Sequence, residues 1–300
     1  MLRIRRSSPW LWGLLLLLAG QARAWAANEG VPRLVTLGGA CRHCVLSGRK
    51  LTGSSFTGGD FSDASLMDSD LRGATFTATT FAGADFTRAD LRSANLFGAS
   101  FSAAIFVDAR MDGIQGAGIR FDGADLKRAS LTSAELVGVS LAGASLVDAH
   151  LGDAALVAAR LTGVDARRAD FHGANLSSAS LAHGKFLDAS FREATLDEAD
   201  LSEADFTRAD FHDVSLDGAH LNGADLSTVR GLDQDDLEDA CGDAATRLPP
   251  GLKIEPCHGR LVFHILPHLA WRAHLHPPFI PHARPAPTWP PAPPQPPTQR

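Results

Sequence analysis

The chain has 300 residues and a formal net charge of −6. The acidic excess lies in the middle, because residues 46–226 hold 26 Asp and Glu against 15 Lys and Arg, whereas residues 1–26 and 258–300 are basic. The 28 glycines are scattered rather than gathered before a helix, which excludes a phosphate-binding loop, and no serine lies in a GxSxG turn, which excludes the hydrolases that use one.

Residues 1–26 predict a signal peptide. Arg3, Arg5 and Arg6 form a basic start, and residues 9–18 form an apolar run that is too short to span a bilayer. Small residues at 22–24 and at 24–26 each offer a cleavage site, so we expect an exported protein, periplasmic or secreted. An uncleaved membrane anchor is the alternative, and the two adjacent arginines form only an incomplete twin-arginine signal.

A repeat of five residues follows. From Leu46 to Leu226 there are 37 positions spaced by five, of which 21 are Leu and 13 are Phe, and the residue two places earlier is Ala in 25 cases. This period matches neither a helix, at 3.6, nor a strand, at 2.0. Where the repeated position shrinks to Gly116, its neighbours grow to Ile114 and Ile119, as expected if both position types share one packed interior.

The repeat resembles a known family. The segments at 84–88 (ADFTR), 94–98 (ANLFG) and 224–228 (ADLST) are similar to A(D/N)LXX, the consensus of the pentapeptide-repeat proteins. This resemblance implies an all-β fold, the right-handed quadrilateral β-helix, in which each five residues form one side of a square coil. Residues 46–230 would then form a pentapeptide-repeat solenoid of about nine coils, with the Leu or Phe and the preceding Ala inside.

One column of charges supports coils of twenty residues. Opposite charges that face each other across a ladder are favourable, and like charges are not. Read at a spacing of twenty, an outer column alternates in sign without an error, whereas three-sided or five-sided coils would scatter it. This stacked charge ladder consists of Asp68, Arg88, Asp108, Arg128, Asp148, Arg168, Asp188 and Arg208.

Both ends of such a solenoid need caps, because each exposes apolar side chains and unpaired strand edges. Residues 27–45 are predicted to cover the first coil. Residues 231–257 resemble the terminal segment of many bacterial members of the family, and within them residues 232–241 read as a short helix. Asp233 is its predicted N-cap, and Gly242 is predicted to close it.

The four cysteines, Cys41, Cys44, Cys241 and Cys257, lie only in these caps. Export predicts disulfides, and three pairings are possible. The implied coils separate the two caps by about 40 Å, which leaves Cys41 with Cys44 and Cys241 with Cys257 unless the tail folds back. The same separation argues against a four-cysteine zinc site. A redox role for the CxxC at 41–44 is the alternative to structural disulfides, although it lacks a thioredoxin-like context.

Residues 258–300 hold twelve Pro, six His and no Asp or Glu, and they predict a disordered tail. Weak binding of a divalent metal by the histidines and docking of the prolines on an aromatic groove are alternatives. A spurious extension of the reading frame is a third.

Two columns of carboxylates form the candidate acidic face. Its residues are Asp85, Asp125, Asp165 and Asp205 in one column, and Asp90, Asp170 and Asp210, together with Asp70, on the neighbouring side. We expect no catalytic residue, no cofactor and no metal, since there is no catalytic set and no GGxGxDxUx calcium turn.

The sequence therefore favours a non-catalytic rod that presents polar and acidic faces to a protein partner in the cell envelope or outside the cell. The resemblance offers a second function, that of a DNA-mimicking inhibitor or protector of a type II topoisomerase. Export argues against it, and the net charge of residues 46–226 is under half of the roughly 26 charges that DNA carries over this length. We do not expect the protein to bind nucleic acid, nor to keep a stable membrane span once the leader is removed. Monomer and homodimer both stay open, as does the partner's identity.

Overall fold

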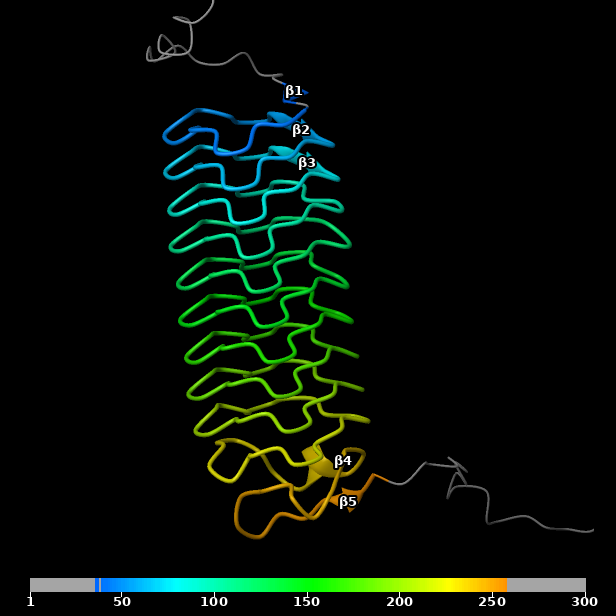
Figure 1. Ribbon diagram of the computed structural model, residues 1–300. Helices are drawn as coiled ribbons and strands as arrows, with labels where there is room; N and C mark the ends of the chain where they lie inside the picture. The colour runs from blue at the N-terminus through cyan, green and yellow to red at the C-terminus, as the bar shows by residue number, and fades with distance from the viewer. Residues whose placement is uncertain (1–35, 38, 258–300) are drawn as a thin grey trace, which may run out of the picture. The chain divides into compact units, whose positions relative to one another are not determined.

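A computed structural model describes residues 36, 37 and 39–257 (Figure 1). The signal peptide and the tail predicted at 1–26 and 258–300 lie outside the described residues. Five short strands are present, and no helix of the described part is long and apolar enough to cross a membrane. The elements are β1 (Thr36–Leu37), β2 (Ser55–Thr57), β3 (Thr75–Thr77), the 3-10 turn η2 (Asp235–Leu237), β4 (Cys241–Gly242) and β5 (Glu255–Pro256).

Parallel bridges between residues twenty apart hold the chain together. Strands β2 and β3 pair in this register, with Phe56 opposite Phe76. Single bridges continue it from the Ala40–Asp60 pair onward, so that successive coils stack as Figure 1 shows. Most bridges stay too short to count as strands because the chain turns a corner every five residues. The twenty-residue spacing is the one that the charge ladder predicts.

The repeated positions fill the interior, as predicted. The Leu and Phe of the repeat are buried from Leu51 to Leu226, and so are the alanines two places earlier. Aromatic rings twenty residues apart stack on each other, with the centroids of Phe86 and Phe106 separated by 4.7 Å and their planes 7° apart. A methyl group on Gly116 would lie 2.8 Å from the Cδ1 atom of Ile119, so the isoleucine fills the space that the missing side chain leaves.

Most corners use the same backbone conformation. From Leu46 to Leu221 the residue two places after the repeated Leu or Phe has a positive φ, and at most of these corners the N–H one place further donates to the carbonyl of that Leu or Phe, as in Ser69 to Leu66. This is the arrangement of a type II turn, which favours Gly at the left-handed position. Many corners nevertheless carry Asp, Arg, Ser or Glu there, at a cost that the packed coils on both sides have to offset.

The predicted C-terminal helix is wrong in its extent. Only η2 forms, as a single turn; Gln234 occupies its N-cap position, and the carboxylate of Asp233 accepts hydrogen bonds from the N–H groups of the next two aspartates. The chain then returns to the ladder, because Cys241 bridges His220 and β4 pairs with β5. Gly242 belongs to β4 and does not close a helix. Leu237 covers the last coil, with 2% of its surface exposed.

Candidate interaction surface

The aspartates of the repeat cap the backbone. Within each five residues, four N–H groups have carbonyl partners in the same turn or in an adjacent coil, and the fifth, one place after the buried Leu or Phe, has none among the described backbone carbonyls. An Asp or Asn two places earlier supplies the acceptor: the N–H of Thr87 donates to Asp85 at 2.8 Å, and that of Ser177 donates to Asn175 at 3.0 Å. The (D/N) of the repeat is therefore explained by a hydrogen bond to a turn N–H that no backbone carbonyl of the described coils accepts.

The candidate acidic face is built from such capping residues. Its seven residues, and Asp70 beside them, are half-buried. Most of these carboxylates also accept a hydrogen bond from the side chain two residues later. Asp125 accepts one from the Nζ atom of Lys127 at 3.0 Å, and Asp165 accepts two from Arg167, both of 2.8 Å. A neighbouring cation thus offsets part of the charge on these columns, and the face is less acidic than the sequence implies.

The charge ladder consists of four separate pairs. Each arginine donates two hydrogen bonds, of 2.6 to 2.8 Å, to the aspartate twenty residues before it. These bonds lower the pKa of all four aspartates and raise that of all four arginines. The pairs are Asp68 with Arg88, Asp108 with Arg128, Asp148 with Arg168 and Asp188 with Arg208.

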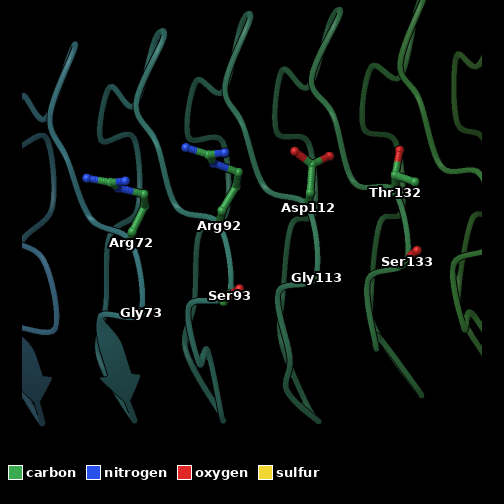
Figure 2. Close-up of a pocket in the computed structure, with 8 residues that line it drawn as sticks. All are labelled: Arg72, Gly73, Arg92, Ser93, Asp112, Gly113, Thr132 and Ser133. Carbon is green, nitrogen blue, oxygen red and sulfur yellow. The ribbon is translucent and has the colours of Figure 1, made fainter.

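An open groove of about 830 Å³ runs along one side of the coils. Figure 2 shows Arg72, Arg92, Asp112 and Thr132 in one column, with their neighbours Gly73, Ser93, Gly113 and Ser133 in the next. Both guanidinium groups are already engaged, because Arg72 donates to Asp70 and Arg92 donates to Asp90. Among the residues that line this groove no hydrogen bond joins a nucleophile to a base.

Sequence reasoning missed a second group of carboxylates, which we call the acidic patch. It comprises Glu193, Asp197, Glu198, Asp213 and Asp217, in two consecutive coils. Thr195 and Ser215 bridge the same two coils on this side, so residues 193–198 lie directly against 213–218. These two segments contain no Lys, Arg or His. The sequence contains the signal for this patch, since four of the five acidic residues form two pairs at outward positions twenty residues apart, Glu193 with Asp213 and Asp197 with Asp217.

The cysteines lie at the two ends of the described coils. The structure joins Cys41 to Cys44 and Cys241 to Cys257 by disulfide bonds, and no free cysteine is present among the described residues. The second bond joins Cys241 of β4 to Cys257, the residue that directly follows β5. Cys41 and Cys44 pack against the buried cluster, so the first bond lies over the coil that begins at Leu46.

Comparisons with known proteins identify the repeat. A profile described as "Pentapeptide repeats" matches residues 69–106, 117–146, 144–182 and 189–227, and a second profile of the same description matches residues 42–85. No curated protein sequence matches the chain.

Several solved structures are similar to this chain. HetL, a pentapeptide repeat protein involved in heterocyst differentiation regulation from Nostoc sp. strain PCC 7120, is 27% identical over 64% of this chain and 92% of its own, with a TM-score of 0.25. A pentapeptide repeat protein of the Arabidopsis thaliana thylakoid lumen is 25% identical over 43% and 79%, with a TM-score of 0.24. A trypsin-treated form of QnrB1, a plasmid-mediated fluoroquinolone resistance protein, is 21% identical over 70% and 92%, with a TM-score of 0.35.

Proposed function

Because the chain belongs to the pentapeptide-repeat family, we propose that it is a right-handed quadrilateral β-helix that acts without catalysis, by holding a protein partner against its side. About nine coils, each of twenty residues, would span residues 46–230, between caps at 27–45 and 231–257. The leader expected from the sequence supports an activity in the cell envelope or outside the cell. Proteins of this family are generally structural or interaction proteins.

The acidic patch carries this proposal. Glu193, Glu198, Asp213 and Asp217 are exposed, and no cation lies in the two segments that present them. The aspartates of the candidate acidic face have a second task, because their carboxylates cap turns and bind neighbouring cations. A partner with a basic surface therefore gains most at the acidic patch, where the negative charge is outward and least offset.

The regular ladder gives the patch a fixed shape. Glu193 and Asp213 occupy equivalent corners of neighbouring coils, as do Asp197 and Asp217 on the side that follows, so their backbone spacing is set by the bridges beneath them. The side chains between them, such as those of Leu196 and Leu216, are buried. A surface that is already ordered loses little conformational entropy when a partner binds.

The competing function is that of a DNA mimic that binds a type II topoisomerase. A mimic needs carboxylates spaced along its whole length like phosphates. In this chain the ladder aspartates are bonded to arginines and the inner columns are engaged locally, so the exposed carboxylates are denser in the last coils and the C-terminal cap than along the rest of the repeat. This distribution favours a compact basic contact over an extended DNA-like one.

A capture experiment with matched variants tests the proposal. The variant Glu193→Gln/Asp217→Asn removes two charges from the acidic patch, and Asp125→Asn/Asp165→Asn removes two from the candidate acidic face while keeping an amide oxygen for each cap. Full-length tagged chains would be expressed in the native host and cross-linked in intact cells. We expect the cross-linked partner to be lost with the first variant and retained with the second. Loss only with the second would move the contact to the candidate acidic face.

Equal capture by both variants and the wild type would overturn an electrostatic contact at either surface. A DNA supercoiling assay with purified type II topoisomerase serves as the test of the competing function. We expect no inhibition at protein concentrations at which the envelope partner binds, and inhibition that the first variant abolishes would favour the DNA mimic.

A further inference from the structure

Three metal-ligating side chains meet at the C-terminal cap. His220 lies in the last regular coil, Cys241 lies in β4, and Cys257 directly follows β5. The Nδ1 atom of His220 lies 3.7 Å from the Sγ atom of Cys241, and the ligand atoms of all three residues lie within 4.8 Å of one another. This is the one such group of three among the described residues.

The fold brings these residues together in two steps. His220 and Cys241 form a parallel bridge, which places their side chains on the same side of the ladder in adjacent layers. Pairing of β4 with β5 then brings residues 255–257 beside Cys241, and the N–H of Cys257 donates to the carbonyl of Gly242. The backbone therefore holds the two cysteines close together, with Cα atoms 4.8 Å apart, by hydrogen bonds that do not depend on the disulfide.

We propose that reduction of the Cys241–Cys257 disulfide converts this cluster into a site for one Zn²⁺ ion, bound by both thiolates and by His220. Two sulfurs and one imidazole nitrogen are ligands that zinc prefers, and a water molecule would complete the tetrahedron. With Zn–S bonds of about 2.3 Å, the sulfurs would lie roughly 3.8 Å apart, so the two sulfurs, bonded to each other in this structure, would have to move apart once the disulfide is broken. While the disulfide is intact its sulfurs are not available as thiolates, so the site exists only in the reduced protein.

The reaction that opens the site is a thiol–disulfide exchange. A dithiol reductant breaks the S–S bond and is oxidised to its own disulfide, and its two protons pass to the sulfurs of Cys241 and Cys257. Binding of the ion then displaces both protons into solvent, because zinc takes the thiolate form. The cap stays closed in both states: by a covalent bond when oxidised and by the ion when reduced.

The surroundings of the cluster favour a cation and allow it to enter. Residues 217–257 hold nine Asp and Glu against three Lys and Arg. His220 is exposed and both cysteines are half-exposed, so a reductant and an ion can reach them.

The disulfide at the other end offers a contrast. His43 lies between Cys41 and Cys44, but its Nδ1 atom lies 3.9 Å from a carboxylate oxygen of Asp63. Those three residues do not form a group of converging ligand atoms. We therefore assign zinc binding to the C-terminal pair alone, and the N-terminal pair serves as an internal control.

Titration of the full mature chain with Zn²⁺ tests the assignment. The protein would be reduced with a phosphine, which becomes the phosphine oxide and adds no competing thiol, and the oxidised protein would be titrated in parallel to subtract binding by other groups such as the tail histidines. We expect one additional equivalent in the reduced protein, release of about two protons per ion at neutral pH, and a higher Tm. The reduced His220→Ala variant should bind Zn²⁺ more than about tenfold more weakly, since even loss of a residue that only hydrogen-bonds to a metal ligand costs about 10- to 100-fold in affinity.

The variant Cys41→Ser/Cys44→Ser should keep the additional equivalent, which shows that the ion is not bound at the other pair. Absence of additional binding in the reduced wild-type protein would overturn the proposal. Equal affinity in the His220→Ala variant, with circular dichroism showing an intact fold, would overturn the role of the histidine. Loss of the equivalent in the Cys41→Ser/Cys44→Ser variant with an intact fold would move the site to the N-terminal pair and contradict the assignment.

Discussion

The guanidinium group of Arg128 donates two hydrogen bonds, of 2.7 and 2.8 Å, to the carboxylate of Asp108, which lies twenty residues earlier in the chain. The substitution Arg128→Asp would place a carboxylate next to that of Asp108 and remove the pair. We expect a Tm lower by a few degrees, and a larger effect at low salt, because exposed charges are screened by salt. Thermal unfolding at two ionic strengths measures this.

The pairs of the ladder are separate, which provides a control. In the double variant Asp108→Arg/Arg128→Asp the two partners exchange places, so their own pair can form again in the opposite orientation. We expect only part of the lost Tm to return, because the arginine at position 108 would face Arg88 and the aspartate at position 128 would face Asp148, each a like charge. An equal loss in the single and double variants would contradict the pairing, and no loss at low salt in the single variant would count against coils of twenty residues.

Capping by the repeat aspartates predicts a difference between Asn and Ala. In Asp85→Ala the N–H and the hydroxyl of Thr87 lose their acceptor, whereas Asp85→Asn keeps an amide oxygen, as Asn95 and Asn175 do in the native chain. We expect the alanine variant to lose roughly 1 kcal/mol of unfolding free energy and the asparagine variant less than half of that. Chemical denaturation together with hydrogen exchange at the Thr87 amide checks it. Equal stability of the two variants would mean that the cap contributes nothing.

The side chain of Ile119 fills the space beside Gly116, which predicts that a larger residue at 116 can be compensated by a smaller one at 119. A methyl group on Gly116 would lie 2.8 Å from the side chain of Ile119 and 3.0 Å from the backbone of Leu96. Gly116→Ala should therefore destabilise the protein by about 1 to 3 kcal/mol through overpacking. Adding Ile119→Val should recover part of this loss, and a double-mutant cycle measures the coupling. Strict additivity of the two substitutions would show that the two positions do not share one space.

The paired carboxylates predict loss of stability in acid. Hydrogen bonds from Arg72 lower the pKa of Asp70 to about 2, and those from Arg88 lower the pKa of Asp68. A carboxylate whose pKa is lower in the folded than in the unfolded state stabilises the fold above the unfolded value of about 3.9, and this contribution is lost as the pH falls through the folded pKa. We expect Tm to be constant between about pH 7 and 5 and to fall between about pH 4 and 2.

The variant Arg72→Leu separates this effect from general acid unfolding. Its Tm should lie below that of the wild type at neutral pH, and the two curves should converge near pH 2, where Asp70 becomes protonated in both proteins. Parallel curves over the whole range would show that the pair with Arg72 does not contribute to the pH dependence.

The repeat could be read from the sequence because its physics is periodic. A buried side chain every five residues and a charge column every twenty, such as Asp108 beneath Arg128, each specify a contact whose partner is found by counting. The same reasoning found the exchange between Gly116 and Ile119. These contacts depend only on the register, and no insertion disturbs the register between Leu46 and Leu226.

Features outside the register could not be obtained by counting. The bridges shift from a spacing of twenty to 21 at the pair of His220 and Cys241 and to 22 at the pair of Asp225 and Arg247, so counting residues does not place the histidine beside the disulfide. Local helix propensity predicted a longer helix than η2, because it does not take account of tertiary pairing. In the structure Cys241 of β4 pairs with His220 of the last regular coil, which ends the helical segment early. The capping role of Asp85 needs the direction of an N–H group, which the repeat pattern does not contain.

Intact-mass analysis of the protein from fractionated native cells, with and without thiol alkylation, tests most directly the claim that this is an exported coil stack closed by a disulfide at each end. The account predicts a chain that lacks about 24 to 27 N-terminal residues, that is found outside the cytoplasm, and that gains no mass from the alkylating reagent. A full-length chain in the cytoplasm with four alkylated cysteines would contradict it.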